Sequence, residues 1–353
     1  MKNGMKVLVI LSLCIMVMLA MTACGRPSAS GGSAAGTGGE YTAENPLIFK
    51  YAHTDSEEHS CHKAGEHLAE YLEKASDGRI KVELYPNGVL GDDEECIKGV
   101  QMGTVTAFVG GGTLPTVAGP EFGFTEMPFV YNSYEDWVIG SFEKGGLEVL
   151  QDALKDTEFE CVDFMYSGTK CICSTKQNYD SIDQFKVWKI RVTPTDINLA
   201  IWKANGANPT PVAWGEVYTG LTQGLIEGVD HTMGNFIDMK FYEEAPYVTV
   251  TNHLISPYTF LMNKEYLASL PDDLREIIIE GIHETCEWQR ELEHEKEEGY
   301  IQELKDLGAT VTIAPEELRQ NMKDNMKQIY EEQKEICGKD VVEKFLATGN
   351  NVD

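Results

Sequence analysis

Residues 187–226 read VWKIRVTPTDINLAIWKANGANPTPVAWGEVYTGLTQGLI and set the expectation for the fold. Apolar residues alternate over 187–192, which predicts a strand. Apolar residues at helical spacing then predict helices over 195–205 and 214–226. A strand followed by helices in this way is typical of an α/β fold, in which helices cover a mostly parallel sheet.

The same alternation continues through the rest of the chain. Further strands are predicted over 47–51, 80–85, 105–109 and 161–174, and further helices over 57–75, 92–102 and 134–154. The longest helical pattern runs over 272–307, with Ser269 as a candidate cap and Gly308 after its end. A helix of that length spans roughly 50 Å and is long enough to back both lobes of a two-lobed protein.

The charge balance excludes one large class of partner. Of the 353 residues, 29 are Lys or Arg and 57 are Asp or Glu, which gives a formal net charge of −28. A protein with this charge repels polyanions, so we expect no nucleic-acid partner and no adhesion to anionic lipid through surface charge.

The N-terminus reads as an export signal. A basic start is followed by an apolar run over 7–20, which is too short to span a bilayer, and then by LAMTAC ending at Cys24. Small residues before a Cys resemble a lipoprotein cleavage site, so residues 1–23 are predicted to be a lipoprotein signal peptide and Cys24 the lipidated residue. A Gly- and Ser-rich tether over 24–45 would then hold the protein at the outer face of the cytoplasmic membrane. The alternative is an ordinary secretory signal cleaved nearby.

Cysteines and histidines offer only a weak metal or redox signal. The chain has nine Cys; setting aside Cys14 in the signal and Cys24 leaves an odd number without CxxC spacing, so neither a disulfide framework nor a zinc knuckle is expected. The histidines between His59 and His67, with Cys61 among them, lack HExxH spacing. Solvated or core side chains are the simpler interpretation, and we expect no metal, no cofactor and no enzymatic activity.

Arg191 and the glycines around Gly111 suggest binding of an anion. Arg191 ends a predicted strand, and strand ends line the ligand crevice of α/β sheets. Its guanidinium fork matches a carboxylate, although a surface Arg is an equally simple interpretation. Trp214 opens a predicted helix, where periodicity alone would make it a core aromatic. Gly111, within the triple glycine that follows another strand, lets backbone N–H groups approach a small anion.

Several motifs resemble those of the DctP-type solute-binding proteins of TRAP transporters. The most extensive similarity runs through 206–230, from GANPTPVAWGEVY to QGLIEGVD. The other matching motifs are YPNGVLGD at 85–92, EMPFV at 126–130, DQFKVWKIRV at 183–192, KFYE at 240–243 and TNH at 251–253. The motifs occur in the order and spacing of that family and span most of the chain.

The resemblance implies a two-lobed, periplasmic-binding-protein-like receptor with a ligand cleft between its lobes. Such a receptor closes on a small organic acid and delivers it to membrane permease subunits. Lobe I would comprise residues 46–168 and 257–296, and lobe II residues 169–256 and 297–353. Two alternatives remain open: a receptor on the same scaffold that feeds a sensor, and an exported metal-dependent hydrolase that uses the histidines near His59.

The resemblance also implies ligand-binding residues. Arg191 falls on the family's ligand-carboxylate arginine, Trp214 on an aromatic position lining the site, and His53 on a polar contact after the first strand. Asn235 is a further candidate polar contact.

The chain departs from the family pattern at two positions. Lys170 stands where an Arg is common, so it keeps the positive charge but loses the planar fork. His231 stands where an Asn is usual. Because a bound anion favours the protonated imidazole, His231 predicts an affinity that rises as the pH falls through the neutral range.

Overall fold

The computed structural model describes residues 41–350. The predicted signal peptide, Cys24 and the tether up to residue 40 therefore lie outside the described residues. Within 41–350, none of the helices combines the length and the apolar character needed to cross a membrane.

A nine-stranded sheet with the order β2-β1-β3-β8-β4-β7-β5-β6 runs through the protein, and β9 is added alongside β8. Two parallel groups, β2-β1-β3 and β7-β5-β6, flank the antiparallel pair β8-β4. The strands are β1 Leu47–Ala52, β2 Ile80–Tyr85, β3 Ala107–Gly111, β4 Phe159–Ser174, β5 Lys189–Val192, β6 Asn208–Pro211, β7 Gly228–Thr232, β8 Tyr247–Asn263 and β9 Thr310–Ile313.

The centre of the sheet corrects one expectation. The sequence predicted a mostly parallel sheet, but β3-β8, β8-β4 and β4-β7 all pair antiparallel, so the sheet is mixed. Strands β4 and β8 have 16 and 17 residues and are buried along nearly their whole length. The sequence predicted β4, over 161–174, but no strand over the residues of β8.

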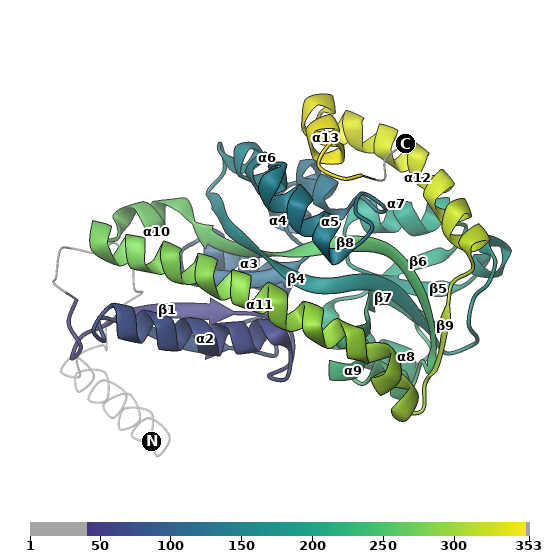
Figure 1. Ribbon diagram of the computed structural model, residues 1–353, viewed down its shortest axis with the longest axis horizontal. Coiled ribbons are helices and arrows are strands. Elements are labelled where there is room, and N and C mark those ends of the chain that lie inside the picture. The colour runs from purple at the N-terminus through teal and green to yellow at the C-terminus, as the bar shows by residue number, and fades with distance from the viewer. Residues whose placement is uncertain (1–40, 351–353) are drawn as a thin grey trace, which may run out of the picture. The chain divides into compact units, whose positions relative to one another are not determined.

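Helices cover both faces of the sheet (Figure 1). Their bounds are α2 Ser60–Ala75, α3 Asp93–Gln101, α4 Pro115–Ala118, α5 Tyr134–Val138, α6 Gly146–Leu154, α7 Asp196–Ala204, α8 Val217–Thr222, α9 Met233–Asp238, α10 Lys264–Ser269, α11 Asp272–Asp306, α12 Glu316–Cys337 and α13 Lys339–Leu346. The helix predicted over 134–154 is interrupted by a π turn at 139–143 and by Gly145, whose φ is +85°. The helix predicted over 214–226 ends at Thr222, before Gly224 with φ +69°.

Helix α11 connects two apolar cores. Its N-terminal half places Ile278 and Ile282 in a buried cluster with α2 and β1, and its C-terminal part places Tyr300 and Leu304 in a second cluster with α8 and α9. Figure 1 shows α11 running from beside α2 to the vicinity of α8 and α9. The predicted long helix is thus present, although Pro271 precedes it and Ser269 does not cap it.

The strand β4 is irregular where the predicted lobes meet. Its register with β8 shifts between Tyr166 and Thr169, and Gly168 has a φ of +93°. Glu297 of α11 binds this segment, because it accepts hydrogen bonds from the Thr169 backbone N–H at 2.7 Å and from the Tyr166 hydroxyl at 2.5 Å. A bulge of this kind locally weakens the ladder and bends the strand. The lobe boundaries themselves stay a prediction.

Candidate ligand-binding site

A cavity with an empty volume of about 300 Å³ lies at the carboxyl ends of the parallel strands. Its lining comes from the loop after β1, the end of β3, the ends of β5 and β7, and the middle of β8. The lining residues are Thr54, Asp55, Asp93, Gly110, Gly111, Arg191, Thr193, Trp214, His231 and Tyr258. Ligands of α/β sheets characteristically bind at this edge. Four of the predicted residues (Gly111, Arg191, Trp214 and His231) are therefore brought together here.

Arg191 is buried in the cavity wall and only partly hydrogen-bonded. Its Nε donates to the carbonyl oxygen of Val212 at 3.0 Å, and its guanidinium carbon lies 5.3 Å from the centre of the Trp214 ring. Its Nη1 has no hydrogen-bond partner within residues 41–350. Burial lowers the pKa of Arg191 to about 10, so the guanidinium stays charged at neutral pH.

Trp214 and His231 form one aromatic wall of the cavity. Their ring centres are 4.6 Å apart at an angle of 37°. Trp214 Nε1 and His231 Nδ1 are buried, and neither has a partner among the described residues. Burial, together with the positive charges of Lys170 and Arg191, holds the pKa of His231 well below its usual value. The imidazole is therefore neutral in the ligand-free protein at neutral pH.

Three buried nitrogens without partners thus surround one small cavity: Arg191 Nη1, Trp214 Nε1 and His231 Nδ1. An unsatisfied buried polar group costs free energy, so three at one place mark a site prepared for a ligand with hydrogen-bonding atoms. A charged guanidinium with a free N–H suits a carboxylate.

Gly111 shapes the opposite wall. It pairs with Tyr258 across β3 and β8. A Cβ at position 111 would lie 2.6 Å from Cδ1 of Tyr258, closer than any side chain tolerates. The Tyr258 ring also stacks on His59, at 5.6 Å between ring centres. Glycine is required here because the ring occupies the space of a side chain.

Lys170 does not line the cavity. Its Nζ lies 3.0 Å from Oε2 of Glu126 in a buried ion pair, and Ser256 donates to the other oxygen of Glu126. The structure therefore gives the Lys170 charge a partner within the protein, and its predicted contact with the ligand stays a prediction.

His53 and Asn235 lie behind the lining rather than in it. Nε2 of His53 is 3.1 Å from Nδ1 of His62, and burial lowers the pKa of His53 to about 4. Asn235 donates from Nδ2 to Oδ1 of Asp55 at 3.0 Å and accepts from the Thr232 hydroxyl at 2.6 Å. Asn235 thus positions a lining residue, and direct contact of either residue with a ligand stays a prediction.

Sequence reasoning missed the acidic members of the lining. Asp55 follows β1 by only three positions, and Asp93 is the first residue of α3. Polar residues directly after a strand, or at the start of a helix near the strand ends, were a usable signal for both. Tyr258 carried no such signal, because it lies in the middle of β8.

The histidines between His59 and His67, which were considered as metal ligands, contact different residues in the structure. His67 stacks on Trp288 at 4.5 Å, away from the cavity, whereas His59 lies beside Asp55. A different trio, His53, Asp55 and Cys61, has candidate ligand atoms within 4.8 Å of one another. In the described part of the chain the cysteines, from Cys61 to Cys337, are free thiols.

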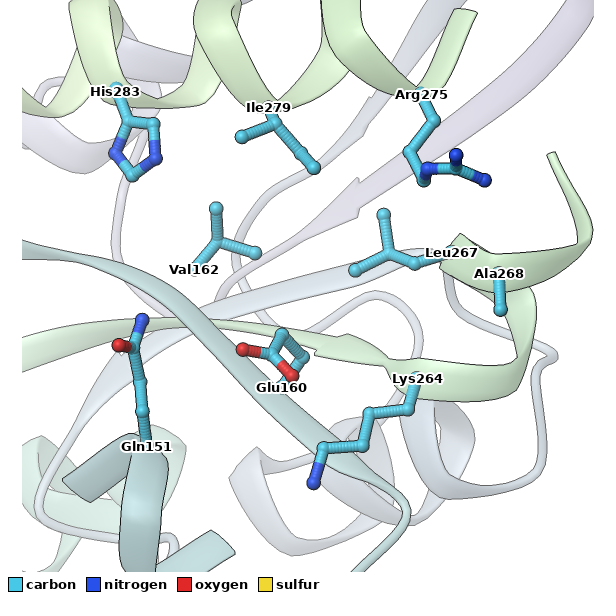
Figure 2. A pocket seen from close by; sticks show the side chains of 9 residues that line it. All are labelled: Gln151, Glu160, Val162, Lys264, Leu267, Ala268, Arg275, Ile279 and His283. Carbon is cyan, nitrogen blue, oxygen red and sulfur yellow. The ribbon is translucent and has the colours of Figure 1, made fainter. Parts of the chain in front are cut away.

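A larger, separate cavity of about 860 Å³ of empty space lies between α6, α10, α11 and β4 (Figure 2). Most of its polar side chains are engaged by neighbours: Lys264 by the Leu154 carbonyl, Gln151 by the Cys161 carbonyl, and His283 by Asp163. None of its lining residues is among the described residues that have a buried nitrogen without a partner, in contrast to the cavity at the strand ends.

Comparison with known proteins identifies the family. The model of the bacterial extracellular solute-binding proteins, family 7 (DctP), matches residues 51–336. An uncharacterised protein of Haemophilus influenzae is 30% identical over 272 residues, covering 76% of this chain and 81% of that one. The C4-dicarboxylate-binding periplasmic protein DctP of Rhodobacter capsulatus is 27% identical over 271 residues, 75% of this chain and 79% of that one.

Solved structures agree with this match. The sugar acid binding protein DctPAm of Advenella mimigardefordensis, in complex with galactonate, superimposes with a TM-score of 0.82 and 26% identity, over 86% of this chain and 97% of that one. This chain belongs to the family of DctP-type extracytoplasmic solute-binding proteins of TRAP transporters. The predicted fold class, an α/β two-lobed receptor fold, is confirmed. The family is defined by binding of a solute rather than by a reaction.

Proposed function

We propose that this protein captures a small organic acid in the cavity at the strand ends, with the ligand carboxylate on Arg191. The observation that carries the proposal is the group of three buried nitrogens without partners around that cavity. The sugar acid binding protein DctPAm binds galactonate and the DctP of Rhodobacter capsulatus binds C4-dicarboxylates, and both kinds of ligand carry a carboxylate.

The charge of the protein makes a local positive group necessary. With a formal net charge of −28, the long-range field opposes the approach of an anion. The buried guanidinium of Arg191 offsets this field within the cavity, where the dielectric constant is low and a charge-assisted hydrogen bond is strong.

In the cell, the protein would act at the outer face of the cytoplasmic membrane. Cys24 would carry the lipid, the tether over 24–45 would hold the receptor at the outer face of the cytoplasmic membrane, and TRAP permease subunits would receive the ligand. Lobes of residues 46–168 with 257–296, and 169–256 with 297–353, would close over the cavity. Bending at the β4 irregularity near Gly168 would allow that closure.

The test is a thermal-shift screen of the soluble body, residues 41–353, against dicarboxylates, sugar acids and keto acids, followed by calorimetry. A ligand at a hundred times its Kd stabilises the protein by about 2.7 kcal/mol. Arg191→Ala should cost about 2–5 kcal/mol of binding free energy, roughly 30-fold to several thousand-fold in affinity, and Arg191→Lys should recover part of it.

Lys189→Ala provides the matched control, because Lys189 is exposed on the same strand and outside the cavity. A folded Arg191→Ala protein that binds the ligand within a few-fold of wild type would contradict the proposal. So would a screen in which no organic acid stabilises the protein.

A further inference from the structure

Two carboxylates, Asp55 and Asp93, line the same small cavity as Arg191. Asp93, Arg191 and Trp214 also line an adjoining cavity, so Asp93 lies where the two spaces meet. An anion-binding cavity that contains acidic side chains must discriminate between ligands by the position of their charges. The two carboxylates differ in how fully the protein already satisfies them.

Asp55 is held by groups of the protein itself. Its Oδ1 accepts from Asn235 at 3.0 Å, and its Oδ2 lies 3.5 Å from the Cys61 sulfur and 3.8 Å from Nδ1 of His59. Burial alone would lower the pKa of His59, but Asp55 and two further carboxylates raise it. Both oxygens of Asp55 thus already have partners within the protein, Asn235 at Oδ1 and the Cys61 thiol at Oδ2, so Asp55 offers little to a ligand.

One carboxylate oxygen of Asp93 remains able to accept a hydrogen bond from a ligand. Its Oδ1 accepts from the Thr54 hydroxyl at 2.5 Å, whereas no side chain within residues 41–350 donates to its Oδ2. Burial raises the pKa of Asp93 to about 6; Asp55 adds to the effect, and Thr54 and Arg191 oppose it. At pH 7.5 the carboxylate is ionised but poorly compensated, so a hydrogen-bond donor beside it is favoured and a second negative charge is opposed.

Arg191 and Asp93 do not neutralise one another. No ion pair, with nitrogen and oxygen within 4.0 Å, joins them among the residues that the structure describes. Both nevertheless line one cavity and interact electrostatically. A free donor on Arg191 and a free acceptor on Asp93 are therefore presented to the same ligand at separate points.

We propose that the cavity selects hydroxylated monocarboxylates of the sugar-acid type over dicarboxylates, with the ligand carboxylate on Arg191 and a ligand hydroxyl donating to Asp93. This inference rests on the proposed function, because it needs an organic acid in the cavity. A dicarboxylate places its second charge near Asp93, and like charges brought together in a buried site are strongly disfavoured. A ligand without hydroxyls leaves the Asp93 acceptor unsatisfied.

The test compares six-carbon ligands, and the shorter dicarboxylate succinate, by calorimetry at pH 7.5. The panel contains D- and L-hexonates including galactonate and gluconate, adipate with two carboxylates, hexanoate without hydroxyls, and succinate. We expect at least one hexonate to bind 10-fold or more tightly than adipate, hexanoate and succinate. Asp93→Asn should weaken hexonate binding by roughly 10- to 100-fold and leave succinate binding equal to or tighter than in wild type.

Glu73→Gln is the matched control. It removes one exposed acidic charge on α2, and Glu73 lines neither of the two cavities that contain Arg191. Its ligand preference should equal that of wild type. Thermal melts of each variant establish that it is folded.

The outcomes separate this inference from the proposed function. If a dicarboxylate, or an amino acid added to the panel, binds more tightly than every hexonate, the sugar-acid inference is wrong, while loss of binding in Arg191→Ala still supports the proposed function. If hexonates bind best but Asp93→Asn keeps their affinity, the role of Asp93 is wrong. If no acid binds, the proposed function itself fails.

Discussion

Gly111 and Tyr258 face each other across β3 and β8, and the tyrosine ring occupies the space where a side chain at position 111 would lie. The ring is held on its other side by His59, so it has little room to retreat. One wall of the cavity thus depends on the absence of a single methyl group.

Gly111→Ala should therefore displace Tyr258 and weaken ligand binding. A small-to-large change in a packed site typically costs about 1–3 kcal/mol, which we expect to appear partly as a lower melting temperature and partly as a Kd raised about tenfold. Gly299→Ala in α11, where no atom lies within 4 Å of the new Cβ, is the control and should leave binding intact. Unchanged affinity in Gly111→Ala would show that Tyr258 does not shape the site.

Replacement of Lys170 distinguishes a structural role from a ligand contact. Because Lys170 forms a buried ion pair with Glu126, Lys170→Ala leaves a buried carboxylate without its partner, which typically costs about 3–5 kcal/mol of unfolding free energy. Urea denaturation should show this loss. The double variant Lys170→Met with Glu126→Met should recover much of it, since it removes both charges. If the double variant is as stable as wild type but binds ligand more than tenfold more weakly, Lys170 contacts the ligand, as the family resemblance implies.

The pH range over which His231 should strengthen ligand binding extends to more acidic values than the sequence alone predicts. A nearby anion raises the pKa of the imidazole in the complex above its value in the free protein, so affinity rises as the pH falls between the two values. Burial and the charges of Lys170 and Arg191 hold the free value well below 6.5. The ratio of wild-type to His231→Asn affinity should thus keep rising as the pH is lowered below 6.5, because the free value has not yet been reached there. A ratio that levels off within the neutral range, measured by calorimetry, would restore the interpretation made from sequence.

Closure of the two lobes should be visible in solution. Bending at the β4 irregularity beside Gly168 would bring the ends of β1 and β3 closer to those of β5 and β7. Small-angle X-ray scattering of the soluble body should therefore show a smaller radius of gyration when ligand is added. Arg191→Ala at the same ligand concentration should show no change. Saturating ligand that leaves the wild-type curve unaltered would exclude closure.

The lipid anchor can be tested in cells. Cys24→Ala should abolish lipidation and release the protein from the membrane fraction, because the tether then carries no hydrophobic chain. The released Cys24→Ala protein should bind ligand as the wild type does. An unmodified mature N-terminus in the wild-type protein, with unchanged fractionation of the variant, would favour the ordinary secretory signal.

Local patterns determined much of the first half of the fold. The alternation of Ile80, Val82 and Leu84 predicted β2, and Asp92 predicted the start of α3, where its side chain accepts a hydrogen bond from the Glu95 backbone. These features depend on neighbours within a few residues, so the sequence carries them directly. The family resemblance further predicted Arg191 and Trp214 as ligand-binding residues, and both line the cavity at the strand ends.

Tertiary structure alone decided the centre of the sheet and the character of the cavity. Strand β8 pairs with β3 and β4, which are distant in sequence, so no local pattern indicates its antiparallel place at the centre of the sheet. The ion-pair partner of Lys170, Glu126, is 44 positions away in the sequence, so no local pattern indicated it, and the contact of Lys170 with a ligand stays a prediction. Asp93 belongs to the site because α3 packs against β3 and β8, whose residues Gly111 and Tyr258 line the same cavity. Charge pairing and burial depend on which groups lie close together in the folded chain. Neighbouring residues specify the local helices and strands, but they do not show which distant groups come into contact.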